Sequence, residues 1–349
     1  MNLLIPFDKI TKKDREFVGG KALALAAMAH EGIKVPDGVC ISALAYQEYI
    51  TSTGLAERIF MELNRKNFTD MRWEEMWDAS LRISNMFLNT LIPQELEENL
   101  RRALEPIAEK GPMVVRSSSL EEDSSKESFA GLHKSYVNVR GISSLLDHIK
   151  SVWASLWSDA ALLYRQELLL SPEKSAMAVI VQELVQGDHS GVAFGQNPRD
   201  ESQAVIEAVY GLNQGLVDGT IEPDRWIIDR ATGRVISHTP ALREKALFAL
   251  DEGVQSKSLP LEKQMVPPLN NEDLKRVYEL IMRLELLFGV PQDVEWTKKG
   301  SFLYALQARP ITTPPSASSG DKRQWYLSLR RSFSNLVTLR KKIEQEHIP

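Results

Sequence analysis

The chain has 349 residues, more than one compact core usually holds, so we expect at least two lobes. Its composition, 43% hydrophobic and 26% charged with a net charge of −5, argues against a general nucleic-acid-binding protein. No stretch approaches the roughly 18 apolar residues of a membrane span, and no signal peptide is apparent, so we expect a cytoplasmic protein with no membrane partner.

The first third of the chain is predicted to be mainly helical. Two glycines and Lys21 precede an alanine-rich helix at residues 22–29, which Gly32 ends. The single cysteine, Cys40, lies in a short apolar strand, where a buried and inert thiol is expected. Residues 44–110 are predicted to be helical throughout.

The central part of the chain predicts strands that alternate with one long helix. Residues 113–116 form a short buried strand, and a polar stretch without apolar periodicity follows at 117–128. A second strand at 135–139 leads into a helix from about 143 to 169. Residues 176–185 are the most strand-like run of the chain.

The last part of the folded region is predicted to contain strands, one further helix and a hairpin. Strands are expected at 191–194, 204–208 and 226–228, with a helix at 271–288 before the hairpin. Short strands and helices that alternate without strict βαβ order predict an α+β protein.

We divide the chain into three segments: a first lobe at 1–186, a second lobe at 187–312, and a tail at 313–349. The tail begins with a linker rich in proline and serine. Beyond it, apolar residues recur at helical spacing opposite a basic face, which predicts an amphipathic helix. That helix either packs on its own domain or docks onto another domain or subunit.

The hairpin carries side chains suited to a metal and a phosphate. Asp293 and Glu295 are two residues apart on one strand, and so share a face; Gln307 and Arg309 do the same on the next strand. Carboxylate and amide oxygens are ligands that Mg²⁺ prefers. A guanidinium can donate two parallel hydrogen bonds to phosphate oxygens. The alternative is an ordinary solvated hairpin with alternating charges.

Two other segments are candidates for phosphate binding. Lys21 lies at the first turn of a helix after two glycines, where backbone N–H groups and the helix dipole favour anions. Arg116 ends a buried strand and is followed by three serines, and Ser135 is a further possible donor. The alternatives are an ordinary loop at Lys21 and a local ion pair between Arg116 and the acidic residues at 121–123.

The end of the most hydrophobic strand is a candidate for base binding. Its residues are Gln182, Glu183, Leu184 and Val185, just before a turn. An adenine ring needs an apolar slot with a backbone donor and acceptor, which a strand end between two lobes can provide. The residue types alone do not assign these roles.

Together these segments resemble the N-terminal nucleotide-binding region of phosphoenolpyruvate synthase, pyruvate phosphate dikinase and rifampin phosphotransferase. The resemblance runs in one order over nearly the whole chain. It is carried by Val18-Gly19-Gly20-Lys21, Val35-Pro36-Asp37-Gly38, Val115-Arg116-Ser117-Ser118-Ser119, Glu122-Asp123, Ser128-Phe129-Ala130-Gly131, Ala154-Ser155-Leu156-Trp157, Tyr164-Arg165, Val181-Gln182, Ser190-Gly191-Val192-Ala193-Phe194, Pro223-Asp224, Glu295-Trp296 and Gln307-Ala308-Arg309-Pro310-Ile311-Thr312.

The resemblance implies an ATP-grasp fold, whose two lobes close on Mg-ATP, and it implies roles for the matching residues. Lys21 and Arg116 would hold phosphates, with Ser135 near them. Arg309 would stabilise the transferring phosphoryl group. These roles agree with the chemistry of phosphoryl transfer, which is chiefly positioning and charge neutralisation.

It also implies roles for the remaining candidates. Gln182 and the strand from Glu183 to Val185 would line the adenine site. Glu295 and Gln307 would bind Mg²⁺, and Asp293 would be a neighbour of the ribose or the metal.

The chain departs from its relatives at three places. Asn213-Gln214 replaces a usual Gly-Glu, which puts one nucleotide contact in doubt. Ala160 stands where an arginine is common, and Leu132-His133 replaces a pair of glutamines. Because the residues of the predicted phosphate clamp are all present, ATP binding is still expected.

Members of this family pass phosphate to a histidine on a mobile domain, and none of the six histidines here lies in such a motif. We therefore expect a partner subunit or domain that bears this histidine and carries the phosphate to a small-molecule acceptor. The chain is either a separate subunit, as in the two-subunit phenylphosphate synthases, or a piece of a longer enzyme; the tail favours the subunit because it offers a docking element.

Two other classes of function are considered beside this phosphotransferase. One is a ligase that makes an acyl-phosphate, against which the colinear resemblance argues. The other is a non-catalytic nucleotide-sensing partner with a degenerate site, which Asn213-Gln214 would favour.

Overall fold

The computed structural model describes residues 3–120, 133–168, 170, 175–251 and 253–311, and the backbone of two short strands, β4 (Asp123–Ser124) and β5 (Glu127–Ser128). The described residues belong to one compact unit, which ends at Ile311. The predicted linker and amphipathic helix at 313–349 lie outside the described residues. Across the described ranges, none of the helices is both long and apolar enough to cross a membrane.

The first sheet has five antiparallel strands in the order β1–β2–β7–β3–β6. They are β1 (Leu4–Pro6), β2 (Gly38–Ile41), β3 (Met113–Ser119), β6 (Ser135–Val139) and β7 (Met177–Glu183). Both faces of its central strands are buried. Val115 and Val181 point into a core of helices, whereas Ala178 and Ile180 point into a second core beside α1.

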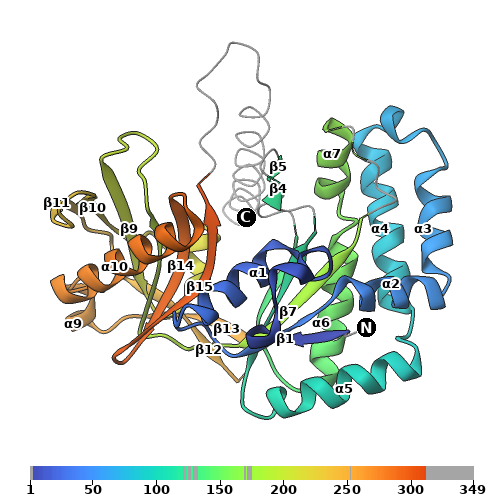
Figure 1. The fold of residues 1–349 in the computed structure, drawn as a ribbon, viewed down its shortest axis with the longest axis horizontal. Coiled ribbons are helices and arrows are strands. Elements are labelled where there is room, and N and C mark those ends of the chain that lie inside the picture. The colour runs from blue at the N-terminus through green and yellow to red at the C-terminus, as the bar shows by residue number, and fades with distance from the viewer. Residues whose placement is uncertain are drawn as a thin grey trace, which may run out of the picture. The chain divides into compact units, whose positions relative to one another are not determined.

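Helices α2 to α7 gather on one side of this sheet, and α1 covers the other (Figure 1). Their bounds are α1 (Arg15–His30), α2 (Ala43–Ser52), α3 (Leu55–Leu63), α4 (Trp73–Asn89), α5 (Gln94–Ala108), α6 (Ile142–Ser155) and α7 (Asp159–Glu167), with 3-10 turns at η1 (Phe7–Lys9), η2 (Lys12–Asp14) and η3 (Phe68–Asp70). The prediction that residues 44–110 are helical throughout is right in the type of element, but the segment is divided into the helices α2 to α5 and the turn η3, with loops between them. Cys40 is buried, and burial raises the pKa of its thiol well above the usual range, as expected of an inert cysteine.

The predicted single helix at 143–169 is wrong, because the chain breaks between α6 and α7. Ser158 caps α7, with its hydroxyl accepting a hydrogen bond from the Ala161 N–H at 3.2 Å. The fully buried Arg165 donates to the Leu156 carbonyl at 2.8 Å, and so satisfies an acceptor exposed by the break. The break turns α7 back onto α4 and lets Arg165 occupy the core.

The second sheet has six antiparallel strands in the order β11–β10–β9–β8–β14–β15, with α10 packed against it (Figure 1). The strands are β8 (His189–Phe194), β9 (Gln203–Tyr210), β10 (Asp224–Asp229), β11 (Val235–Thr239), β14 (Gln292–Lys299) and β15 (Phe302–Pro310). The helices are α8 (Gln214–Val217), α9 (Leu261–Gln264) and α10 (Asn271–Phe288), and a separate hairpin comprises β12 (Lys245–Leu250) and β13 (Gly253–Ser258).

Strands are found where they were predicted, but the end of β3 and the length of the hairpin turn differ from the prediction. Ser117, Ser118 and Ser119 belong to β3 and are fully buried, so the polar stretch does not begin at 117. The polar run at 297–301 predicts a five-residue turn in the hairpin, but the turn is only Gly300-Ser301, because the strands extend to Lys299 and from Phe302. Strand β1 and the β12–β13 hairpin were not predicted; their short or mixed sequences carry little periodic signal.

Gly19 interrupts α1 and presses against β3. Its φ of 72° and ψ of 172° are not helical, so the helix restarts just before Lys21. The Ser118 hydroxyl donates to the Val18 carbonyl at 2.6 Å and accepts the Ala22 N–H at 3.2 Å, which ties both sides of the kink to the strand. A Cβ atom at Gly19 would lie 2.5 Å from the Ser118 carbonyl oxygen, so only glycine fits.

Replacing Gly19 with alanine should therefore cost more stability than the same change at Gly32. Both residues have positive φ, which costs roughly 1–2 kcal/mol for any other residue, but Gly32 has no atom within 4 Å of its added Cβ. For Gly19→Ala we expect a loss of roughly 3 kcal/mol or more in the free energy of unfolding, because overpacking adds to the strain. Urea unfolding measures both values, and equal losses would show that the contact with Ser118 is unimportant.

Candidate functional site

Arg116 extends from β3 of the first sheet to the β14–β15 hairpin of the second. Its Nη2 lies 3.0 Å from Oε2 of Glu295 and 2.6 Å from Oε1 of Gln307, and its Nη1 donates to the Leu306 carbonyl at 3.3 Å. The side chains of Arg116 and Glu295 are only 14% and 20% exposed. One predicted phosphate ligand and both predicted metal ligands therefore meet at one point.

The hairpin places its four candidate side chains as cross-strand neighbours. Glu295 is opposite Gln307 and Asp293 is opposite Arg309. The expectation that the side chains at alternate positions of each strand lie on one face of the hairpin is therefore confirmed. Arg309 holds the Asp293 carboxylate through Nε at 2.8 Å and Nη2 at 2.6 Å. Burial raises the pKa of Asp293, and the Arg309 guanidinium opposes that shift.

Lys21 and Ser135 lie next to Arg116. The Lys21 ammonium is 3.5 Å from the hydroxyl of Ser117, the residue after Arg116 on β3. Ser135 is the cross-strand partner of Arg116 on β6 and is exposed. Lys21 and Ser135 are thus linked to Arg116 through its neighbours in the chain and in the sheet, and all three can bind phosphate oxygens.

The predicted base-binding strand end borders a small apolar cluster that both lobes share, which we name the slot. Its buried members are Leu184, Leu212 and Ala249, and the partly buried Val114, Val137, Leu247 and Val254 pack against them. Gln182 is paired with Val114 in the sheet, so their side chains share a face. Its side chain is buried, and Oε1 has no hydrogen-bond partner within the described part of the chain.

Glu183 does not contribute its side chain to the slot. Its carboxylate is exposed, and it is paired with Met113, whose side chain faces the helical core on the other side of the sheet. Its N–H donates to the Asp37 carbonyl, and the Leu184 N–H donates to the Pro112 carbonyl. These two N–H groups are thus occupied, and what Glu183 can still offer a base is its carbonyl.

Asn213 is a candidate that its residue type did not single out. The sequence marks it only as a departure from relatives, whereas the structure shows its carboxamide buried with neither Oδ1 nor Nδ2 hydrogen-bonded to a described residue. It follows Leu212 of the slot directly. A buried polar residue without partners is a signal that only the folded chain provides.

Other residues that carry the resemblance lie in the scaffold. Trp157 donates its Nε1–H to Tyr46 Oη at 3.0 Å within the helical core, where Arg165 is also buried. Asp224 is buried in the second lobe and accepts hydrogen bonds from both Arg243 and His238. These motif residues hold each lobe together rather than lining the site.

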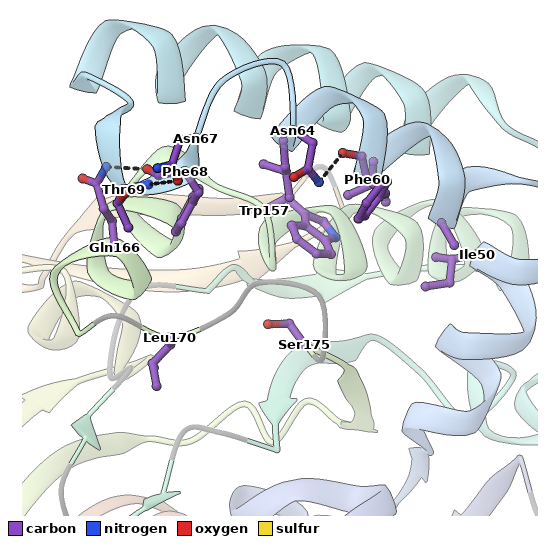
Figure 2. Close-up of a pocket in the computed structure, with 13 residues that line it drawn as sticks. Ile50, Phe60, Asn64, Asn67, Phe68, Thr69, Trp157, Gln166, Leu170 and Ser175 are labelled. Atoms are coloured by element: carbon purple, nitrogen blue, oxygen red, sulfur yellow. Dashed lines mark hydrogen bonds between the residues drawn. The ribbon is translucent and has the colours of Figure 1, made fainter.

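A pocket of about 490 Å³ in the helical part of the first lobe is separate from this site (Figure 2). None of its lining residues is charged, and the amide of Gln166 already donates to the carbonyls of Phe68 and Met71 at 2.7 and 2.9 Å. Residues 171–174, between its lining residues Leu170 and Ser175, are outside the described part of the chain. The pocket has no group suited to phosphate or metal chemistry.

The donor set at Arg116 fits a magnesium nucleotide rather than a protein-only metal site. The described residues contain no cluster of three or more His, Cys, Asp or Glu side chains that would hold a metal alone. Glu295 and Gln307 supply two hard oxygens, and Mg²⁺ usually takes its remaining ligands from water and substrate phosphates. Arg116, Lys21 and Ser135 are groups that suit phosphate oxygens.

Comparison with known proteins agrees with this geometry. Residues 15–327 match the family described as the pyruvate phosphate dikinase AMP/ATP-binding domain. The chain is 34% identical over 308 residues to a probable phosphoenolpyruvate synthase of Archaeoglobus fulgidus, covering 87% of this chain and 41% of that protein. It is 31% identical over 323 residues to a probable phosphoenolpyruvate synthase of Methanocaldococcus jannaschii, covering 90% and 27%.

It is also 29% identical over 334 residues to the rifampicin phosphotransferase of Bacillus subtilis, covering 94% of this chain and 38% of that protein. Among solved structures, a D-alanine–D-alanine ligase from Bacillus anthracis is similar at a TM-score of 0.32 and 10% identity, over 83% of this chain and 56% of that one. A likeness at that score carries no weight in the assignment. The chain spans from about a quarter to under half of the length of these curated relatives.

The expected α+β ATP-grasp fold is confirmed, with one antiparallel sheet in each lobe. The lobe boundary at 186 and 187 stays a prediction, and so do the roles of the individual site residues. Because the family match extends over most of the chain, the chain belongs to the pyruvate phosphate dikinase AMP/ATP-binding domain family.

Proposed function

We propose that this chain is the ATP-binding component of a phosphotransferase, which passes a phosphoryl or pyrophosphoryl group from Mg-ATP to a histidine on a partner subunit or domain. The final small-molecule acceptor is reached through that partner, as in a phosphoenolpyruvate synthase or a phenylphosphate synthase. The observation that carries the proposal is the meeting of Arg116 with Glu295 and Gln307, beside the Arg309–Asp293 pair.

The residues have distinct tasks in this scheme. Arg116 and Lys21 hold phosphate oxygens, Ser135 donates to one of them, and the slot receives the adenine ring. Glu295 and Gln307 hold Mg²⁺, which when bound neutralises charge on the phosphates. Asp293 keeps the Arg309 guanidinium oriented toward the phosphoryl group that moves.

The transfer itself is a single displacement at phosphorus, in which one bond forms and one breaks. For pyrophosphoryl transfer, an imidazole nitrogen of the partner attacks the β phosphorus, the new P–N bond forms, and the bond from that phosphorus to the oxygen bridging the α phosphate breaks, its electron pair leaving on AMP. Attack at the γ phosphorus would transfer one phosphoryl group and release ADP instead. Charge then develops on the transferring oxygens and on the leaving oxygen, where fixed guanidinium groups stabilise it. The family description names AMP beside ATP, which supports AMP as the nucleotide that leaves.

Arg309 should affect transfer far more than binding. An arginine that acts on the transferring group is worth about 10³-fold or more in rate, so Arg309→Ala should lower AMP formation by that order while ATP affinity changes little. The assay supplies a candidate histidine-bearing partner in trans and follows AMP and labelled phosphohistidine. The matched control is Arg225→Ala, because Arg225 is also paired with a carboxylate on the second sheet and is 46% exposed against 44% for Arg309.

The same assay separates the proposal from its alternatives. Transfer at the wild-type rate in Arg309→Ala would contradict the role given to this residue. ATP binding with no turnover in the wild-type chain, with any histidine-bearing partner, would favour the nucleotide-sensing function that Asn213-Gln214 motivates. An acyl-phosphate product would point to the ligase.

The contact between Arg116 and Glu295 also makes a prediction about magnesium. In the structure the guanidinium is paired with the ligands that Mg²⁺ would take, so metal and phosphates must replace that pair together. Mg²⁺ should therefore raise ATP affinity strongly in the wild type. In Glu295→Gln, ATP alone should bind several-fold more tightly, because Arg116 is released, and the gain from Mg²⁺ of about tenfold or more should be lost.

Calorimetry of ATP with EDTA and with saturating Mg²⁺ measures both affinities. Glu285→Gln is the matched control, because Glu285 also pairs with a partly buried arginine, Arg230, but on α10 and outside the hairpin that carries Glu295. It should leave both affinities unchanged. A Glu295→Gln protein that loses ATP affinity in EDTA, or retains the full gain from Mg²⁺, would rule out this exchange.

A further inference from the structure

The Asn213 side chain is buried without using any of its hydrogen-bonding capacity. The residue is 7% exposed, and it alone among the described residues leaves two buried side-chain polar atoms without partners. A buried carboxamide that pairs with nothing lowers stability, because it has lost water and gained no partner. Such a group in a native chain calls for a ligand or a water.

Asn213 is the N-cap residue of α8, but its side chain does not cap the helix, which is the usual role of asparagine at an N-cap. Asn213 precedes α8, and its main-chain carbonyl accepts the N–H groups of Leu216 and Val217 at 3.1 Å. Its side chain makes no capping hydrogen bond to that helix. The carboxamide is therefore left over from the local structure and is available to something else.

The backbone before Asn213 sets its place beside the slot. Gly211 has a φ of 72° and is bridged to Leu247, and the Leu212 N–H donates to the Leu247 carbonyl at 2.9 Å. This anchors Leu212 in the slot, next to Leu184. Asn213 follows immediately, so its backbone adjoins the slot, and its carboxamide is buried in that region.

A second orphaned amide belongs to the same region. Gln182 Oε1 is buried without a partner among the described residues, and Gln182 on β7 is the cross-strand neighbour of Val114 on β3, which packs against the slot. The slot is thus a cluster of apolar residues, and the segments that adjoin it contribute buried, unpaired amide atoms from both lobes, in Gln182 and Asn213. This is the composition of a site for a flat heterocycle whose edge has donors and acceptors.

We propose that Asn213 reads the Hoogsteen edge of the adenine ring, with Oδ1 accepting from the N6 amino group and Nδ2 donating to N7. The inference rests on the proposed ATP site. An asparagine carboxamide matches this donor–acceptor pair of adenine bidentately. Guanine shows two acceptors there, O6 and N7, and a single carboxamide cannot donate to both with this geometry, so Asn213 sets a preference for ATP over GTP.

The test compares nucleotides that differ at one atom. In 7-deaza-ATP a carbon replaces N7, so the acceptor for Nδ2 is absent while the ring shape is kept. With saturating Mg²⁺ and by calorimetry, we expect the wild type to bind 7-deaza-ATP about five- to tenfold more weakly than ATP, and GTP at least tenfold more weakly. Asn213→Ala should bind ATP and 7-deaza-ATP equally and should lose most of the discrimination against GTP.

Two further variants make the result specific. Asn213→Asp keeps the shape but has no donor, so it should also bind ATP and 7-deaza-ATP equally even if the alanine variant folds poorly. Asn197→Ala is the control, because Asn197 is equally buried at 7% exposed, but its amide is satisfied by Gln203 and the Arg199 N–H. It should keep the wild-type preference for ATP over 7-deaza-ATP.

The outcomes distinguish this inference from the function on which it rests. A wild-type chain that binds no ATP overturns both. ATP binding with no wild-type penalty for 7-deaza-ATP, or the same penalty in Asn213→Ala and Asn213→Asp, overturns the role of Asn213 and leaves the ATP site standing.

Discussion

The site depends on one interaction, in which the Arg116 guanidinium joins the first sheet to the hairpin of the second. Its partners Glu295 and Gln307 are 179 and 191 positions away in the chain. The lobes must be held closely for this contact, and the core that contains Ile180, α1 and the second sheet does so. An error in strand register of one residue would turn Arg116 or Glu295 to the opposite face and separate them.

The pairing of Arg116 with Glu295 and Gln307 also matters for stability, because it compensates charges that are largely withdrawn from water. Without its partner, a half-buried guanidinium or carboxylate would carry a desolvation cost, because it has lost water and gained no opposite charge. Paired, they satisfy one another. The proposed site is therefore tuned to the metal–nucleotide complex rather than to either component, whereas its base slot retains unpaired amides at Gln182 and Asn213.

The residues that make this chain resemble its relatives divide by task. Lys21, Arg116 and the hairpin side chains converge on the site, whereas Trp157, Arg165 and Asp224 stabilise the lobes around it. The scaffold matters because phosphoryl transfer requires groups held in fixed positions. Motif residues shared with relatives thus serve either the proposed site or the scaffold, and the contacts of each residue in the structure distinguish the two.

Sequence alone determined the elements whose signal is local: α10, the alternating faces of the β14–β15 hairpin, and the grouping of Asp293 with Glu295 and of Gln307 with Arg309. Tertiary structure decided that Ser117–Ser119 continue β3, because neighbouring strands pair with them, and that the helix after Ser143 breaks before Ser158 to bury Arg165. It also decided which amides remain unpaired. Periodicity depends on neighbours along the chain, but pairing across the sheets and the burial of a carboxamide depend on residues far away in sequence.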